Sequence, residues 1–126
     1  MSGAADIAAD RSAQASLRTS LTAAVTYYTD AATYGGLTPG EIRTIEPDLD
    51  YVPGDAPSAD DSTLSITVPP DGEGDVYAAA ALPDSGMCFT IRDDRSKESA
   101  TTFGVITDGS PCTGEAALLP AETRWP

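Results

Sequence analysis

The chain of 126 residues contains no histidine and no asparagine. Histidine is the commonest general base and the commonest zinc ligand, so a Ser-His-Asp triad and most zinc sites are excluded. Without asparagine the chain has no acceptor for N-glycosylation. The sequence also lacks a P-loop for phosphate binding and a serine in a nucleophile-elbow pattern. We therefore expect the protein not to be an enzyme and to bind no cofactor.

Basic residues and long apolar runs are also scarce. Seven Lys and Arg residues stand against 20 Asp and Glu residues, which gives a formal net charge of −13. Such a field repels the phosphate backbone of nucleic acids and favours cationic partners, divalent ions or positively charged surfaces. The longest apolar run, VYAAAAL at 76–82, is far shorter than the ~20 residues of a membrane-spanning helix. A hydrophobic content of 40% still supports one modest core, so we treat residues 1–126 as a single domain.

The chain has only two cysteines, Cys88 and Cys112. They do not form a CxxC motif, and two thiols alone cannot complete a structural zinc site. The simplest interpretation is one disulfide, which implies an oxidising, extracytoplasmic location. Closing a loop of this length stabilises a domain by roughly 3–4 kcal/mol in the chain-entropy model. The alternative is a pair of buried free thiols.

Residues 4–34 are expected to form one long helix, because residues 4–33 contain no proline or glycine and are rich in strong helix formers. Gly35 and Gly36 then supply the left-handed conformation that ends a helix. Before Leu17 only Ile7 is large and apolar, so the first half of the helix has little to bury. From Leu17 onward an apolar stripe has the spacing of one helical face and comprises Leu17, Leu21, Ala24, Val25, Tyr28 and Ala31.

Residues 35–62 are expected to form an acidic connection. TPGE (38–41) has the form of a capping box with Thr38 as N-cap, and it predicts a short helix through Ile45. Residues 46–62 contain three prolines and six acids with no base, which is typical of an exposed loop. These acids either keep the loop solvated, which we prefer, or bind cations or a basic partner. The apolar residues expected to anchor the region are Ile42, Ile45, Leu49, Tyr51 and Val52.

From residue 63 to residue 106 the hydrophobic period becomes two, which indicates strands. STLSITV (62–68), VYAAAAL (76–82), MCFTIRD (87–93) and TTFGVI (101–106) are joined by short connections. Such connections predict an antiparallel meander of three or four strands. Alternation places Met87, Phe89, Ile91, Phe103 and Val105 on the face that packs on the helix. The expected helix–sheet core comprises Leu17, Leu21, Val25, Tyr28, Phe89, Ile91, Phe103 and Val105.

The C-terminal residues 107–126 have little periodicity. Because Cys88 alternates with Phe89, it should lie on the outer face of the sheet, where a disulfide would hold this tail through Cys112. Trp125 then serves either as a lid on the tail, which we prefer, or as an exposed binding aromatic.

Two further features have competing interpretations. Asp71, Glu73 and Asp75 place carboxylates at alternate positions of a glycine-rich turn, which suits calcium, although a solvated hairpin turn is the simpler interpretation. Tyr27 flanks the helical stripe and faces either a neighbouring subunit or the chain's own loop. Neither feature predicts a metal site strongly enough to assign one.

The order of these elements resembles that of the type IV pilin and pseudopilin family. The matching stretches are RSAQASLRTSLTAAVTYYTDAATYGG, LTPGEIRTIEPDL and the cysteine-bracketed CFTIRDDRSKESATTFGVITDGSPC. Family members combine an amphipathic helix ending in an aromatic-rich turn, a loop, a meander sheet and a disulfide-bounded C-terminal region. The family's apolar N-terminal segment, with its early glutamate and cleavage signal, has no counterpart in residues 1–126, so no residue of that motif is carried over.

The resemblance implies an α+β, pilin-like fold with four parts, comprising a helical spine (4–34), an acidic loop (35–62), a small sheet (63–106) and a stapled tail (107–126). It implies a structural subunit of a type IV pilus or of a type II secretion pseudopilus, active in adhesion or protein secretion. The partners would be other pilin subunits, contacted through the N-terminal helix. The full-length form would be membrane-anchored before it joins a cell-surface filament. The alternative is an extracellular adhesion or ligand-binding module that does not polymerise.

Overall fold

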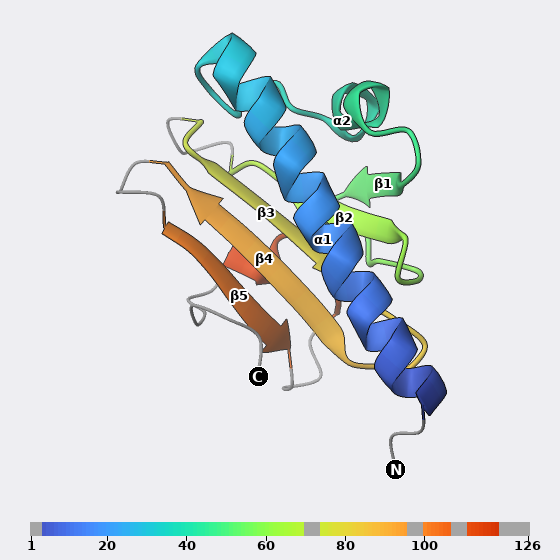
Figure 1. The fold of residues 1–126 in the computed structure, drawn as a ribbon. Coiled ribbons are helices and arrows are strands. Elements are labelled where there is room, and N and C mark those ends of the chain that lie inside the picture. The colour runs from blue at the N-terminus through green and yellow to red at the C-terminus, as the bar shows by residue number, and fades with distance from the viewer. Residues whose placement is uncertain (1–3, 70–73, 96–99, 107–110, 119–126) are drawn as a thin grey trace.

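The structure is a computed structural model that describes residues 4–69, 74–95, 100–106 and 111–118. One long helix lies across one face of a twisted sheet, as Figure 1 shows. The predicted α+β class with a long N-terminal helix is confirmed. In chain order the elements are α1 (Ala4–Ala31), α2 (Pro39–Ile45), β1 (Asp50–Pro53), β2 (Thr63–Thr67), β3 (Val76–Ala81), β4 (Cys88–Asp94), β5 (Ala100–Ile106) and the 3-10 turn η1 (Ala116–Leu118).

The sheet has five strands in the order β1-β2-β3-β4-β5. β1 pairs with β2 in parallel, and the other neighbours are antiparallel. The predicted antiparallel meander over residues 63–106 is confirmed for β2 to β5. The sheet also has the fifth strand β1 and is mixed, so the prediction of a purely antiparallel sheet with three or four strands is wrong. The additional strand lies in the expected acidic loop, because burial of Leu49 and Tyr51 draws that segment against β2. Arg43 of α2 fixes it further by donating a hydrogen bond to the carbonyl of Tyr51 at 3.0 Å.

Helix α1 packs over β3 and β4 through small side chains as well as through Leu17. Ala13 and Ser16 are buried, so the expectation that the first half of the helix has little to bury is wrong in part. Ala13 belongs to the same buried cluster as Ala79 and Ala81 of β3, which are also fully buried. Small residues on both sides let the helix axis approach the sheet closely, and tight packing then replaces large apolar area.

The expected helix–sheet residues are distributed between the centre and the margin of this core. Leu17, Phe89 and Ile91 are buried at its centre. Leu21, Tyr28, Phe103 and Val105 are partly buried and pack against it. Val25 is half-buried, Ala31 is exposed, and Met87 is 44% exposed because it precedes β4 rather than belonging to it. The inward position predicted for Met87 is therefore wrong.

The main helix ends at Ala31, before the expected glycine pair. Ala32 adopts a left-handed conformation with φ of 60°, which stops the helix. The following turn carries Tyr34 into the core, where its backbone N–H donates to the carbonyl of Gly74 at 2.5 Å. The early end of the helix frees Tyr34 to turn into the core, which it could not reach as part of a continued helix. The N-cap of α2 is as predicted, since Thr38 accepts a hydrogen bond from the N–H of Glu41 at 3.2 Å.

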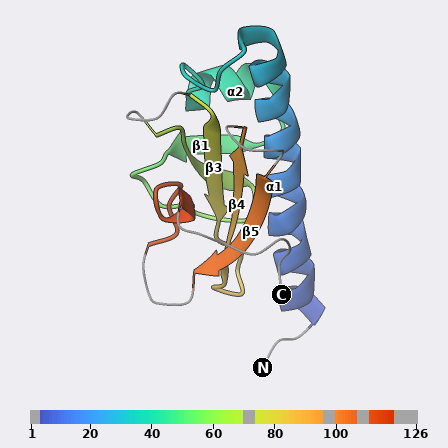
Figure 2. The same cartoon turned by 90° about the vertical axis from the view of Figure 1, so that its left-hand side faces the viewer.

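The opposite face of the sheet is covered by the segment around η1, which Figure 2 shows on the side away from α1. The predicted disulfide is confirmed, with the Cα atoms of Cys88 and Cys112 5.6 Å apart. Both cysteines are buried beside Ala80, with Leu82 and Ile106 packed against them. The sheet therefore separates two apolar clusters, a large one under α1 and a small one around the disulfide.

Gly114 allows the tail to approach β2 closely, and we predict that Gly114→Ala destabilises the domain. An added Cβ would lie 2.8 Å from the backbone of Ser65 and Ile66, nearer than real side chains come. The N–H of Gly114 also donates to Ser65 Oγ at 2.8 Å. We expect a loss of about 1–3 kcal/mol in the free energy of unfolding, measured by urea denaturation.

Gly40 offers a matched control for that substitution. It lies in α2, and the group that its added Cβ would meet is the Thr38 hydroxyl at 3.8 Å, an ordinary van der Waals distance. Gly40→Ala should be neutral or should stabilise by about 0.4–1 kcal/mol. Equal effects of the two substitutions would contradict the close approach of the tail.

Candidate functional site

A buried carboxylate, Asp93, organises the polar part of the core. It lies on β4 in the alternation that also turns Phe89 and Ile91 toward α1, and it is 1% exposed. Tyr34 donates its hydroxyl to Asp93 Oδ2 at 2.5 Å, and Arg95 donates Nε to the same oxygen at 2.9 Å. A buried carboxylate requires such donors, since an unpaired buried charge is strongly unfavourable. A further donor, Thr101, reaches Asp93 Oδ1 at 3.0 Å and completes the set that we call the Asp93 cluster, which is Tyr34, Asp93, Arg95 and Thr101.

The Asp93 cluster connects the last part of the helix to the sheet. The guanidinium of Arg95 lies 5.7 Å from the ring centroid of Tyr28 on α1. The rings of Tyr28 and Tyr34 are 4.8 Å apart, and Tyr77 of β3 follows at 5.9 Å from Tyr34. Tyr77 in turn donates its hydroxyl to Ser20 of α1 at 3.0 Å. These contacts fix the helix relative to β3 and β4 by directional bonds in addition to apolar packing.

Three buried tyrosines make the stability of the domain sensitive to alkaline pH. Burial raises the pKa of Tyr51 to about 12 and also raises the pKa values of Tyr34 and Tyr77. An unfolded tyrosine has a pKa near 10, so above about pH 10 the unfolded chain loses protons that the folded chain keeps. This stabilising contribution is complete below about pH 10 and is lost as the pH rises through the folded values. We expect the contribution of Tyr51 alone to fall by about 2–3 kcal/mol between about pH 10 and pH 12.

The control for this prediction is Tyr51→Phe. It removes the hydroxyl that donates to the carbonyl of Glu46 at 3.2 Å, so a loss of about 1 kcal/mol is expected at neutral pH. The free energy of unfolding of this variant should then fall less steeply above about pH 10 than that of the unchanged chain. Parallel curves for the two proteins would show that Tyr51 does not contribute.

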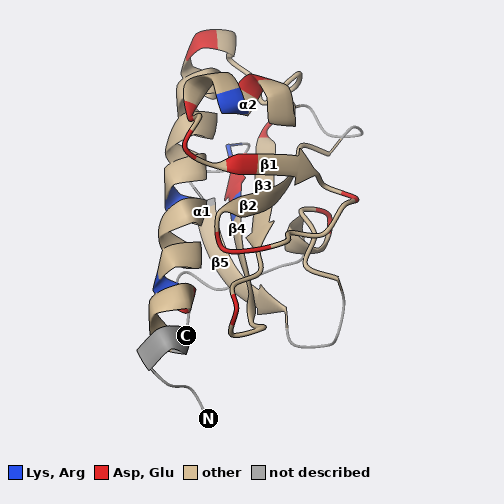
Figure 3. Cartoon of the chain, turned by 90° about the vertical axis from the view of Figure 1, so that its right-hand side faces the viewer, with Lys and Arg blue, Asp and Glu red and all other residues tan. Residues whose placement is uncertain are grey.

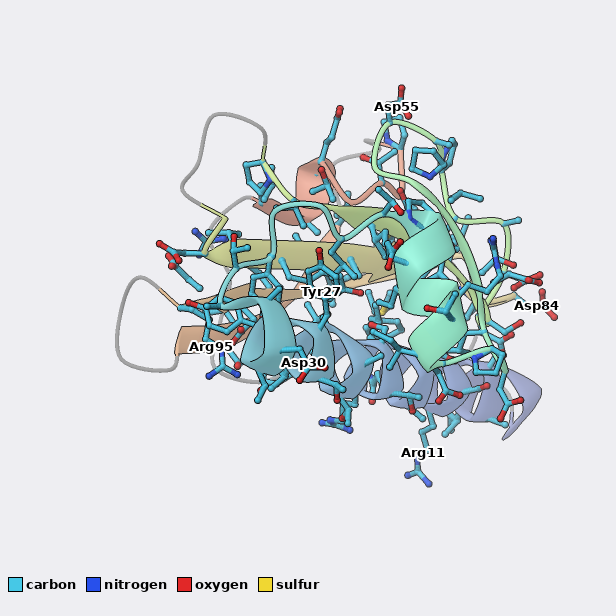
Figure 4. All side chains as sticks on the ribbon, turned by 90° about the horizontal axis from the view of Figure 1, so that it is seen from above. Arg11, Tyr27, Asp30, Asp55, Asp84 and Arg95 are labelled. Atoms are coloured by element: carbon cyan, nitrogen blue, oxygen red, sulfur yellow. A yellow bond between two sulfur atoms is a disulfide. The ribbon has the colours of Figure 1, made fainter. Side chains whose placement is uncertain are left out.

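The side of α1 that is turned away from the sheet carries no acid over its central turns. The sequence from Arg11 to Thr29 contains no Asp or Glu, in a chain with 20 of them. Arg11 points away from the sheet in Figure 4, and the guanidinium of Arg18 lies 5.8 Å from the ring centroid of Phe103. We call the exposed part of this region the outward helix face, comprising Arg11, Ser12, Ala15, Arg18, Thr19, Thr22, Thr26 and Thr29.

Acidic residues gather instead over α2, β1 and the loop that follows β1, coloured red in Figure 3. Arg43 of α2 is a basic residue near these acids, and its guanidinium donates a hydrogen bond to the Tyr51 carbonyl. The exposed loop predicted for residues 46–62 is wrong for Asp50–Pro53, which form strand β1, although Asp48, Asp50 and Asp55 are exposed as expected. We call the exposed members the acidic surface, comprising Glu41, Asp48, Asp50 and Asp55.

The end of α1 nearest the N-terminus extends past the ends of the strands in Figure 1. Ile7 is 48% exposed there, and with Met87 it forms the pair of exposed large apolar residues found among the described residues. Asp10 accepts a hydrogen bond from the hydroxyl of Ser85, in the loop between β3 and β4. The N–H of Met87 donates to that same hydroxyl at 3.3 Å. Both apolar residues therefore lie near the place where the helix enters the domain.

The other residues singled out from the sequence have mixed outcomes. Tyr27 faces its own loop, since its hydroxyl donates to the carbonyl of Gly35 at 3.1 Å. Asp71, Glu73 and Trp125 lie outside the described residues, and Asp75 Oδ1 accepts from Tyr28 at 3.5 Å. Within the part of the chain that the structure describes, no three His, Cys, Asp or Glu residues are grouped to hold a metal ion. Among those same residues, no helix combines the length and apolarity needed to cross a membrane.

Sequence reasoning did not identify the Asp93 cluster. A signal for it was present, because the alternation of Phe89 and Ile91 continues to Asp93 and places an acid on the inward face. An acid in such a position requires buried donors. Its main donor, Tyr34, lies in a segment that was expected to be the end of the helix.

Comparisons of the chain with protein-family models, with curated proteins and with solved structures found no match. A function for the chain must therefore be inferred from the geometry of the described residues and from the sequence.

Proposed function

We propose that the chain is a structural subunit of a type IV pilus or of a pilus-like filament such as a type II secretion pseudopilus. It would act by assembly through its N-terminal helix rather than by catalysis. In this proposal the full-length form is held in the cytoplasmic membrane before assembly and then lies in a filament at the cell surface. Other subunits are its partners, and the sheet forms the outer coat together with those parts of the acidic loops that no neighbouring subunit covers.

The observation that carries this proposal is the position of α1. It has 28 residues and is therefore about 42 Å long. One side packs on the sheet, while the opposite side stays exposed along the helix and its first turns extend past the strands (Figure 1). A helix arranged in this way can pack on other subunits along its length without disturbing the core of its own domain. The directional contacts through Tyr77 and the Asp93 cluster would transmit force between helix and sheet.

The confirmed disulfide supports the same proposal. Disulfides persist in oxidising compartments, as expected of a protein outside the cytoplasm. Cys88 and Cys112 hold the tail on the outer face of the sheet, the side away from the helix. In a filament this side would be exposed to solvent, shear and proteases, and a covalent link limits local opening of the tail.

The proposal is tested by locating the protein on the cells that encode it. Immunogold labelling with an antibody against this domain should mark filaments, and deletion of the gene should remove the labelled filaments. The DNA upstream of the codon for Ala4 gives an independent test. A long apolar run with a glutamate near its start supports the filament.

A second candidate function is an extracellular adhesion or ligand-binding module that does not polymerise. The acidic surface favours it, because clustered carboxylates suit a basic partner. A cleavable secretory signal upstream, with label in the medium or spread evenly over cells that bear no labelled filament, would support this module and contradict the filament.

A further inference from the structure

We propose that the outward helix face of one copy docks on the acidic surface of a second copy, in a head-to-tail contact. This inference rests on the proposed function, because it names the partner surface that α1 uses in the assembly. The occupant is a second copy of this chain, and the argument for it is charge complementarity between two surfaces of the same molecule.

The outward helix face differs from an ordinary solvated helix surface. An amphipathic surface helix carries charged side chains opposite its apolar stripe, but the eleven residues of α1 from Thr19 to Thr29 contain no charged residue. Thr22, Thr26 and Thr29 donate their hydroxyls to carbonyls one turn earlier, at 3.2, 2.9 and 2.9 Å. Their γ-methyl groups are therefore the parts left to contact a neighbour. Arg11 adds a positive charge at the N-terminal end of this face.

Charge decides which surface of a second copy can approach this face. With a net charge of −13, two copies repel each other wherever acid meets acid. Between Arg11 and Thr29 the helix carries no acid, so it can approach an acidic surface without that repulsion. The acidic surface offers four exposed acidic residues over α2, β1 and the following loop. Pairing of these two surfaces brings opposite charges together and keeps the acids of the two molecules apart.

The relative placement of the two surfaces predicts an open assembly. Arg11 and Asp55 project from opposite sides of the molecule in Figure 4. A contact between two different surfaces is heterologous, and it leaves one unoccupied copy of each surface at the two ends of every complex. Further copies can therefore add as long as the rotation between successive copies does not close a ring, whereas a two-fold dimer of helix faces would stop at two.

The test compares substitutions of opposite charge at one position on each surface. Thr26 lies on the outward helix face, and Thr44 lies on α2 beside Glu41; both are exposed. Self-association of the chain is measured by sedimentation up to about 1 mM protein, at about 0.01 M salt where charges act over long distances. Thr26→Lys should tighten the association about twofold to fivefold and Thr26→Glu should weaken it by a similar factor. At Thr44 the signs should be reversed, with Lys weakening and Glu tightening.

The alternatives give different sign patterns. If both lysine substitutions tighten the association, only the net charge matters and the proposal is overturned. If both Thr26 variants weaken it while the Thr44 variants have no effect, the contact is a closed dimer of helix faces and the proposal is again overturned. Absence of any association of the unchanged chain at about 1 mM has the same consequence.

Failure of this inference is distinguishable from failure of the filament proposal. Labelled filaments on cells, combined with a sign pattern other than the predicted one, overturn the inference and leave the filament proposal standing. The predicted sign pattern without labelled filaments supports head-to-tail pairing and contradicts the filament.

Discussion

Replacing Asp93 with alanine is expected to lower the free energy of unfolding by about 3–5 kcal/mol, measured by urea denaturation. The substitution leaves the buried hydroxyl of Tyr34 and the guanidinium of Arg95 without their common acceptor. It also removes the acceptor of Thr101. Small domains have a total stability of about 5–15 kcal/mol, so this change removes most of the stability of a domain at the lower end of that range.

Two further variants separate this network from a general effect of removing an acid. Asp84 is exposed in the loop between β3 and β4, so Asp84→Ala should change the stability by less than about 0.5 kcal/mol. Tyr34→Phe should cost about 1–2 kcal/mol, and its effect should be smaller when Asp93 is already alanine. Strictly additive effects of Tyr34→Phe and Asp93→Ala would contradict their hydrogen bond.

Much of the architecture can be predicted from local sequence patterns. The proline-free, glycine-free start predicts α1, and the TPGE motif predicts α2. Two-residue alternation predicts β2, β4 and β5, and the short apolar run VYAAAAL between turns predicts β3. β1 could not be predicted in this way, because Pro47, Pro53 and Pro57 and the surrounding acids are typical of a loop. Its strand conformation comes from a parallel pairing with β2, in which Tyr51 lies opposite Leu64. Such pairing is a tertiary effect that short-range propensity does not contain.

The burial of small residues in α1 could not be predicted from the spacing of its apolar residues. Ser20 is fully buried, yet a scale of side-chain hydrophobicity places it on the surface. Its hydroxyl donates to the carbonyl of Leu17 at 2.7 Å and accepts from Tyr77. The structure thus buries a polar side chain because both of its hydrogen-bonding roles are filled.

The disulfide connects the fold to the proposed location. Alternation in β4 correctly placed Cys88 on the face away from Phe89, and the second cysteine brings the tail to that face. In the described part of the tail, three hydrogen bonds to the rest of the domain act independently of the disulfide. The backbone N–H of Ser58 donates to the carbonyl of Cys112. The N–H of Gly114 donates to the hydroxyl of Ser65, and the N–H of Glu115 donates to the carbonyl of Gly54. Loss of the covalent link should therefore loosen the tail without necessarily unfolding the main core.

Replacing Cys88 and Cys112 together with alanine is expected to lower the free energy of unfolding by about 3–4 kcal/mol. The unfolded chain gains the freedom that the closed loop had removed, while the core under α1 keeps its contacts. Hydrogen exchange should locate the effect. The amides of Ser58, Gly114 and Glu115 should lose protection first, and the amide of Ile91 in the centre of the sheet should retain it up to global unfolding.

The same experiment requires proof that the unchanged chain is oxidised. Its intact mass should be lower than that of the reduced chain by two hydrogen atoms. Both cysteines are at most 5% exposed, so a reducing agent should act only after the tail opens, and the rate of reduction should follow that opening. Equal masses before and after reduction would remove the disulfide and with it the support for an oxidising location. Uniform loss of protection in the alanine variant, including at Ile91, would instead show that the tail and the sheet unfold as one unit.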